Sequence, residues 1–186
     1  MAFYTQSELS ELGFKFLGRN VKISNKAAIY GHENISIGDN SRVDDFCVIS
    51  GRVTIGRNVH MAVYSHLAGG RPGITMEDFS GLAYGVQVFT QSDDYSGKSM
   101  TNPTVPSKYK LETEAAVHIG RHCIIGTNAL ILPGVTIAEG TSVGAMSMVT
   151  KSTETWSIYF GTPAKRIKKR SKELLDLERQ YLTDSS

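Results

Sequence analysis

The chain has few of the features that mark membrane, secreted or nucleic-acid-binding proteins. Its 186 residues include two cysteines, Cys47 and Cys123, too few to hold a chain of this size together by disulfides, so a reducing cytoplasm is the expected compartment. No apolar run approaches the roughly 18 residues of a membrane span, and the N-terminus lacks the basic-then-apolar order of a signal peptide. With 20 Lys+Arg against 18 Asp+Glu, the net charge of +2 argues against a nucleic-acid partner.

What the sequence does contain is an aliphatic residue that returns every six positions. One unbroken stretch consists of Ile37, Val43, Ile49, Ile55, Met61 and Leu67. The same frame holds Leu17, Ile23, Ile29, Met76, Leu82, Val88, Ile119, Ile125, Ile131, Ile137, Val143 and Val149. The fifth residue of nearly every window is small or valine, so each window supplies one large and one small inward side chain. Such a unit is a short strand plus a turn, and three units close one triangular coil. The sequence therefore predicts an all-β fold, a parallel β-helix of hexapeptide repeats.

The repeat frame slips three times, and each slip predicts an insertion. Two extra residues precede Ile37, three lie around Gly69–Gly73, and 25 run from Asp94 to His118. Loops as long as the third insertion are usually functional or disordered. The predicted organisation is therefore an N-terminal helix or cap over 1–16, a β-helix over 17–153 with the loop insertion 94–118, and a C-terminal exit segment and helix over 154–186.

Helical patterns at both ends complete the predicted organisation. Residues 5–12 carry a possible N-cap at Thr5 or Ser7 with acidic residues in the first turn. Residues 171–182 place five apolar residues at helical spacing behind a possible Ser171 cap. Both helices are expected to pack on the β-helix or to cover its open ends, because an exposed last coil would be a sheet edge.

Several motifs make the chain similar to a known family. They are Ile125-Gly126-Thr127-Asn128-Ala129, Ile131-Leu132-Pro133-Gly134-Val135, Val143-Gly144-Ala145, Thr150-Lys151 and Gly161-Thr162-Pro163-Ala164-Lys165. With the repeat, they resemble the hexapeptide-repeat acyltransferases. The resemblance implies a left-handed β-helix, a homotrimer with active sites between subunits, and acetyl-CoA or a longer acyl-CoA as co-substrate.

A second resemblance indicates the class of molecule that accepts the acyl group. Ser92–Gly97 and Asn102-Pro103-Thr104 look like the branch that contains nucleotide-aminodeoxysugar N-acyltransferases of the anthrose-pathway type and surface-polysaccharide acetyltransferases. This implies N-acylation of a nucleotide-linked aminodeoxysugar, such as dTDP-4-amino-4,6-dideoxyglucose, in O-antigen or surface-glycan biosynthesis. Many sugar O-acetyltransferases of the family carry a catalytic histidine where this chain has Thr90–Asp94, so the usual base for a hydroxyl acceptor is missing.

Candidate catalytic residues lie at the two ends of the long insertion. Asp93 and Asp94 open it and His118 closes it, and the ends of a loop that leaves and rejoins one solenoid lie near each other. An Asp–His pair could orient an amine or accept its proton. The aspartates could equally be turn residues that cap backbone N–H groups. We expect Tyr84, His66 and Arg71 to contact the substrate.

The family resemblance also implies a set of cofactor-binding residues. It places Thr127 and Ala145 against the pantetheine arm of CoA, and Thr150 and Lys151 near the same cofactor. Lys165 and Lys168 would contact its phosphates, although their basic cluster could also be a solvated lead-in to the last helix.

Two alternatives to this function stay open from sequence. An O-acetyltransferase would use His118 as base, and a trimeric scaffold would keep the β-helix without chemistry. A metal site is not expected, since His118 and His122 lack a third histidine near position 82.

Overall fold

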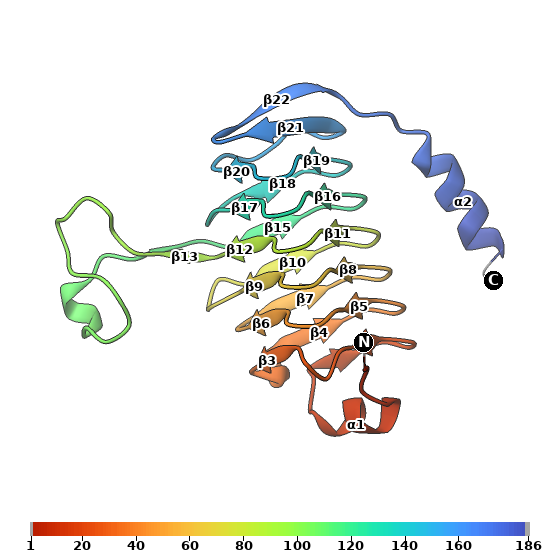
Figure 1. The fold of residues 1–186 in the computed structure, drawn as a ribbon, viewed down its shortest axis with the longest axis horizontal. Helices are drawn as coiled ribbons and strands as arrows, with labels where there is room; N and C mark the ends of the chain where they lie inside the picture. The colour runs from red at the N-terminus through yellow and green to blue at the C-terminus, as the bar shows by residue number, and fades with distance from the viewer. Residues whose placement is uncertain (1, 185–186) are drawn as a thin grey trace.

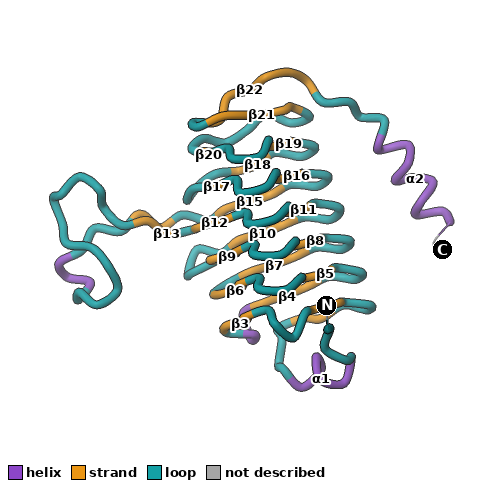
Figure 2. The backbone as a smooth tube through the Cα atoms, viewed as in Figure 1, coloured by secondary structure: helices purple, strands orange, loops and turns teal. Residues whose placement is uncertain are grey.

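The chain forms a triangular column of stacked coils (Figures 1 and 2). A computed structural model describes residues 2–184. Residue 1 of the predicted cap and residues 185 and 186 of the predicted exit segment lie outside the described residues. The parallel β-helix expected from the six-residue repeat is confirmed.

Three parallel sheets form the sides of the column, and successive strands of the chain move from one sheet to the next. Sheet 1 contains β1 (Phe16–Leu17), β4 (Ile35–Ile37), β7 (Val53–Ile55), β10 (Ile74–Met76), β15 (Val117–Ile119) and β18 (Thr136–Ile137). Sheet 2 contains β2 (Lys22–Ile23), β5 (Arg42–Val43), β8 (His60–Met61), β11 (Gly81–Leu82), β16 (Ile124–Ile125), β19 (Ser142–Val143), β21 (Ser157–Gly161) and β22 (Ala164–Lys169). Sheet 3 contains β3 (Ala28–Tyr30), β6 (Val48–Ser50), β9 (His66–Ala68), β12 (Gln87–Phe89), β17 (Leu130–Ile131) and β20 (Met148–Val149).

The pairing register follows the sequence repeat. Along sheet 1 the Cα partners form one unbroken series, Leu17, Ile37, Ile55, Met76, Ile119 and Ile137. These are the residues at which the repeat frame begins each coil. A slip of one residue would turn every large side chain outward, so the buried column fixes the register.

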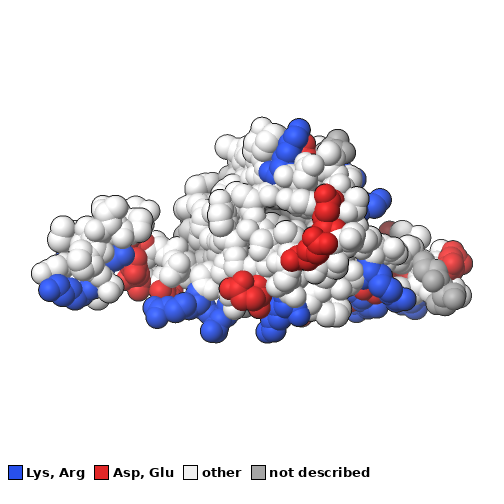
Figure 3. Space-filling view, turned by 90° about the horizontal axis from the view of Figure 1, so that it is seen from below, with Lys and Arg blue, Asp and Glu red and all other residues white. Residues whose placement is uncertain are grey.

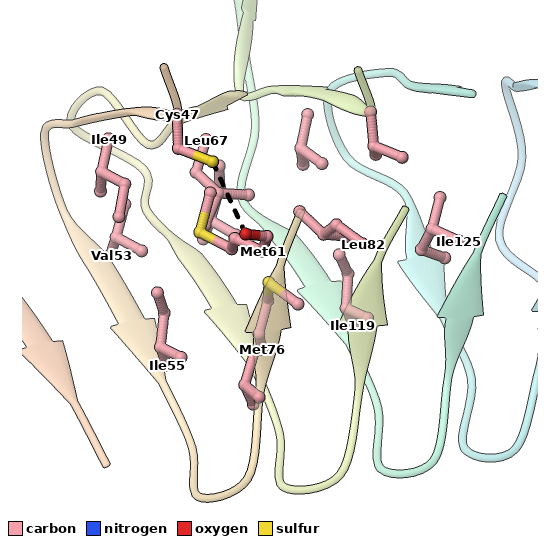
Figure 4. Packing of buried hydrophobic residues seen from close by; sticks show 14 of the residues in the cluster. Cys47, Ile49, Val53, Ile55, Met61, Leu67, Met76, Leu82, Ile119 and Ile125 are labelled. Carbon is pink, nitrogen blue, oxygen red and sulfur yellow. Dashed lines mark hydrogen bonds between the residues drawn. The ribbon is translucent and has the colours of Figure 1, made fainter. Parts of the chain in front are cut away.

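The interior of the column is a continuous stack of aliphatic side chains (Figure 4). Met61, Leu82 and Ile125 follow one another on sheet 2, each no more than 1% exposed. The two cysteines occupy small inward positions, and Cys47 Sγ donates to the carbonyl of Ala62 at 3.1 Å and, as Figure 4 shows, to that of Met61 at 3.6 Å. Burial raises the pKa of Cys47 to about 11 and that of Cys123 to about 12, so neither thiol is nucleophilic near neutral pH.

Three corners join the sheets, and they differ in regularity. Corner 2–3, between sheets 2 and 3, consists of two-residue turns at 45–46, 63–64, 84–85, 127–128 and 145–146. Corner 3–1, between sheets 3 and 1, receives all three insertions. The first forms η1 (His32–Asn34), the second is the Gly69–Gly73 turn, and the third is the long loop.

The long loop projects away from the column on a short stem (Figure 1). The stem is the antiparallel pair of β13 (Gln91–Ser92) and β14 (Thr113–Glu114), and the loop carries η2 (Ser107–Tyr109). The predicted insertion 94–118 is thus displaced. The chain leaves the column before Asp94, and His118 already lies within β15, because Val117 and His118 complete a strand in register with β10.

The two ends of the chain carry the expected helices with shifted bounds. Helix α1 (Gln6–Glu11) begins after the Thr5 cap, whose hydroxyl accepts from the backbone N–H of Glu8. Helix α2 is Leu174–Asp184, three residues later than the predicted start at 171. The basic cluster that precedes α2 is no solvated lead-in, because it forms β22 and pairs with β21 in a hairpin. Among the described residues, no helix is long and apolar enough to cross a membrane.

Candidate active site

The outward side of sheet 3 is the uncharged face of the column. Its six strands contain no Lys, Arg, Asp or Glu. The outward side chains of this uncharged face include Val48, His66, Phe89, Leu130 and Met148. In the space-filling view the flank between the loop at the left and the peak of the molecule is free of charged side chains, whereas charges gather along the lower edge (Figure 3). An uncharged sheet face bounded by two corners is the expected appearance of a protein–protein contact.

Asp94 and Asp93 both lie in the projecting loop and organise its backbone. Asp94 accepts from the N–H groups of Ser96 at 2.8 Å and Ser99 at 3.2 Å, and from the Ser99 hydroxyl at 3.1 Å. Hydrogen bonds from Ser96 hold the pKa of Asp94 below its ordinary value. Asp93 accepts from the N–H of Asn102 at 3.4 Å. The aspartates therefore act as turn residues within one chain, and Asp94 stays ionised at neutral pH.

His118 lies on the outward side of β15, where it pairs with a carboxylate that sequence reasoning missed. Its Nε2 lies 3.1 Å from Glu77 Oε1, and both side chains are about 40% exposed (40% and 41%). Thr75 and Thr136 flank His118 in the register of sheet 1. Within one chain His118 and Asp94 thus have different partners. A pairing between a coil and the next could not be foreseen, because Glu77 lies far from His118 in sequence.

Arg71 belongs to the base of the loop. Its guanidinium donates to both carboxylate oxygens of Glu114, at 3.1 and 3.2 Å, and Gln91 donates to the same carboxylate at 2.7 Å. The hydrogen bonds from Gln91 and Arg71 lower the pKa of Glu114. Arg71 thus ties the Gly69–Gly73 turn to the loop stem, while its side chain remains 84% exposed and open to a ligand.

Corner 2–3 gathers three predicted site residues into one straight column. Tyr84 is 60% exposed, and its carbonyl accepts from the N–H of Asn128 at 2.8 Å. One coil further, the carbonyl of Thr127 accepts from the N–H of Met146 at 2.8 Å, beside Ala145. The hydroxyl of Thr162 donates to the carbonyl of Met146 at 3.0 Å and continues the column.

Lysines at the top of the column complete the cofactor candidates. Lys165 is exposed in β22, where it pairs with Phe160 and follows the turn whose Thr162 hydroxyl donates to Met146. Lys168 is exposed further along the same strand. Thr150 and Lys151 are exposed on corner 3–1, at the opposite edge of sheet 3 from Thr127 and Ala145. One chain therefore places Thr127 and Ala145 on neighbouring turns of corner 2–3 and leaves Thr150 and Lys151 apart from them.

His66 lies on the uncharged face, between the two corners. Its ring meets the Phe89 ring edge-to-face at 5.4 Å between centroids. Burial lowers its pKa, so His66 is neutral at physiological pH. In the part of the chain that the structure describes, no three His, Cys, Asp or Glu side chains cluster as metal ligands would.

Residues 116–151 match the bacterial transferase hexapeptide family, six repeats. A dTDP-4-amino-4,6-dideoxy-D-glucose acyltransferase of Escherichia coli is 44% identical over 96% of this chain and 94% of its own length. This chain belongs to the hexapeptide-repeat acyltransferases, the class that uses acyl-CoA donors.

Solved structures of one enzyme share nearly the whole fold. AntD, an N-acyltransferase from Bacillus cereus in complex with dTDP and 3-hydroxybutyryl-CoA, is 45% identical over 100% of this chain and 99% of that one, with a TM-score of 0.98. A serine-to-alanine variant of AntD in complex with dTDP-4-amino-4,6-dideoxyglucose and coenzyme A is 46% identical over 98% of each chain, with a TM-score of 0.97. A maltose O-acetyltransferase of Clostridium difficile, at 21% identity and a TM-score of 0.60, shares the fold.

Proposed function

We propose that the protein transfers an acyl group from acyl-CoA to the amino group of a nucleotide-linked aminodeoxysugar, with dTDP-4-amino-4,6-dideoxyglucose as the first acceptor to test. The observation that carries the proposal is corner 2–3, a column of turns that runs from Tyr84 past Thr127 and Ala145 to Thr162, three residues before Lys165. A linear pantetheine arm can lie along such a column, and Lys165 provides a cation for the CoA phosphates. The E. coli relative is named for the same acceptor class.

The uncharged face supports a homotrimer with active sites between subunits. Sheet 3 is bounded by corner 2–3 on one side and corner 3–1 on the other. When three copies close a ring through this face, corner 2–3 of one copy meets corner 3–1 of the next. Tyr84 and Thr127 then lie opposite the loop of a neighbouring copy, with Asp94, Arg71 and Lys151. Residues that one chain keeps apart are brought together by assembly.

The chemistry follows from the charge and protonation of these groups. The neutral amine attacks the thioester carbonyl carbon, a C–N bond forms, and the tetrahedral intermediate collapses with loss of the C–S bond. The amine loses one proton and the departing thiolate takes up one, so the products are the amide and free CoA thiol. A carboxylate with a lowered pKa is a weak base, so Asp94 serves to orient the amine, while His118 or water carries the proton.

A hydroxyl acceptor is the second candidate, and the His118–Glu77 pair is the observation that favours it. An alcohol needs a general base in the transition state, and a carboxylate that orients an imidazole is a recurrent way to provide one. The pair is half-exposed on sheet 1 and accessible to a ligand.

The decisive measurement is thiol release from acetyl-CoA with dTDP-4-amino-4,6-dideoxyglucose, beside the matched sugar nucleotide with a 4-hydroxyl group. Turnover with the amine alone is expected. Turnover with the hydroxyl sugar alone would replace the proposal with O-acetylation by His118. If neither sugar nucleotide leads to thiol release, while acetyl-CoA still raises the Tm of the protein, the acceptor class is wrong.

The same proposal places the enzyme in the cytoplasm, in the synthesis of O-antigen or another surface glycan. Two buried free thiols suit a reducing compartment. The donor acyl-CoA and a nucleotide sugar would be drawn from the same compartment.

A further inference from the structure

Two aromatic side chains on corner 2–3 form an exposed stack that the proposed function has not used. Phe46 and Tyr64 lie one coil apart, with ring centroids separated by 5.2 Å and planes inclined by only 13°. Phe46 is 47% exposed and Tyr64 61% exposed. They are 18 residues apart, which places them at the same position of consecutive coils. This ladder continues the column of turns that carries Tyr84 and Thr127.

The backbone at this stack adopts a conformation that bulky residues seldom take. Phe46 has a φ of 59° and Tyr64 a φ of 66°, both in the left-handed region. Further along the same column the equivalent positions are Gly85, Asn128 and Met146, and the first two are the residue types that accept this conformation most readily. Large rings at Phe46 and Tyr64 are thus held against the local backbone preference, as happens where a side chain has a task.

A second aromatic stack in the same molecule shows how such rings are normally covered. On corner 1–2, between sheets 1 and 2, the left-handed turn positions hold Phe79, His122 and Trp156. Phe79 and His122 stack at 5.4 Å, and Tyr181 of α2 closes over Phe79 at 6.1 Å. His122 and Trp156 are consequently buried, at 7% and 8% exposure. No described helix covers Phe46 and Tyr64 in this way: the Nζ of Lys26 lies 5.8 Å from the centroid of the Phe46 ring, and both rings stay about half exposed.

We propose that Phe46 and Tyr64 form the platform on which the nucleobase of the sugar nucleotide stacks. This inference rests on the proposed function and names its nucleotide subsite. Flat rings attract bases through their π faces with little dependence on sequence. The thymine of a dTDP-sugar is such a base, and the Tyr64 ring, one coil further from Lys26 than the Phe46 ring, is the surface open to it.

The spacing of the coils fits this occupant. Strands of neighbouring coils lie roughly 4.8 Å apart. Three steps therefore separate Phe46 from Thr127, about 14 Å along the column. Tyr84 lies two steps from Phe46, about 10 Å, so an extended nucleotide sugar with its base on the Phe46–Tyr64 stack would pass its diphosphate along the corner and present its amine between Tyr84 and Thr127. The thioester would meet the amine there, at the end of the pantetheine arm.

The test removes the rings without disturbing the turn. Phe46→Asn and Tyr64→Asn are suitable variants, because Asn128 already holds the left-handed conformation in the same column. Tyr64→Phe keeps the ring and loses only the hydroxyl. Phe16→Ala is a matched control, since Phe16 is 56% exposed on sheet 1, away from the corner. The probe is dTDP alone, followed by calorimetry, with acetyl-CoA as a second ligand and sedimentation to report the assembly state.

Each Asn variant should weaken dTDP binding by about fivefold or more, with acetyl-CoA affinity and assembly state unchanged. Tyr64→Phe and Phe16→Ala should bind dTDP like the wild type. Unchanged dTDP affinity in both Asn variants would overturn the platform, and so would their dissociation into monomers, which would make the stack a subunit contact. If the wild type itself neither binds dTDP nor acylates the aminosugar, both the proposed function and the platform are wrong. If the wild type acylates the aminosugar and both Asn variants bind dTDP as tightly as the wild type, the proposed function stands and only the stacking platform is wrong.

Discussion

Corner 2–3 and corner 3–1 bound the same sheet, yet they are built in opposite ways. Corner 2–3 repeats one two-residue turn from coil to coil, and each turn donates a backbone hydrogen bond to the turn below. Corner 3–1 takes every insertion, including η1, the Gly69–Gly73 turn and the long loop. Under the proposed function, the repeated corner would offer the same contacts at even intervals to a linear cofactor. The irregular corner would supply side chains that differ from coil to coil to recognise the acceptor.

The largest expected effect comes from making corner 3–1 regular as well. Replacement of residues 94–111 by Asn-Gly would close β13 and β14 as a two-residue hairpin, since Ser92 already pairs with Thr113. We expect kcat/KM for the aminosugar to fall at least about a hundredfold, because the groups that position the acceptor are lost. Acetyl-CoA affinity should persist, since corner 2–3 is intact. Loss of both in parallel would contradict the division between the corners, and Tyr95→Ser is the control within the loop.

A point substitution on the same corner should act more mildly. Asp94→Asn keeps the size of the side chain and removes its charge, so turnover should fall at least about tenfold with CoA affinity unchanged. Steady-state kinetics with the concentration of each substrate varied in turn would separate the effect on turnover from any effect on CoA affinity. Asp93→Asn is the matched control and should retain more activity, because Asp93 makes one long bond to Asn102 where Asp94 makes three bonds. Wild-type turnover in Asp94→Asn would remove this residue from the mechanism.

The packing of the two corners can be compared with a pair of glycines. Gly85 on corner 2–3 has a φ of +68°, and an added Cβ would collide with the side chain of Asn128. Gly97 in the loop has a φ of +78° and open space around it. Gly85→Ala should therefore destabilise the fold by about 1–3 kcal/mol, and Gly97→Ala by less, measured as free energies of urea unfolding. Equal losses would show that the corners are packed alike.

The smallest expected effect is a change in the pH dependence of stability, and it comes from His66 on the uncharged face between the two corners. The folded pKa of His66 is lowered by burial, so the unfolded chain binds a proton more readily than the folded one. Stability is then present above the unfolded pKa of about 6.5 and is lost as the pH falls through the folded value. A Tm measured from pH 7.5 to 5.5 should decline more steeply for the wild type than for His66→Gln. Identical slopes would assign the acid sensitivity to other groups.

The inward-facing residues and their pairing could be predicted from sequence, because burial requires an apolar side chain at each repeat position. Leu17, Ile37, Ile55, Met76, Ile119 and Ile137 pair in the order that the six-residue frame implies, and the three slips of the frame are three real insertions. The outward half follows no such rule. Glu77 pairs with His118, and Glu178 of α2 lies within 2.9 Å of His122, through contacts between residues far apart in the chain.

At the C-terminal end, the pattern of charged residues did not predict the strand that forms there. The basic run that includes Lys165 and Lys168 has no apolar alternation typical of a buried strand, yet it forms β22. It does so because the hairpin with β21 satisfies the edge of the last coil. Phe46 and Tyr64, by contrast, had a usable signal, since their spacing of 18 residues is that of one coil.

The long loop also divides the chain in the order of its folding. Ile74 pairs with Val53, 21 residues earlier, whereas Val117 must find Ile74 across 43 residues. Closure of the doubled span costs about 0.6 kcal/mol more in chain entropy. We therefore expect addition of the fifth coil to be about threefold slower than addition of the coils before it. The four coils before the loop can assemble as one cooperative unit and serve as a template on which β15 and the coils after it grow.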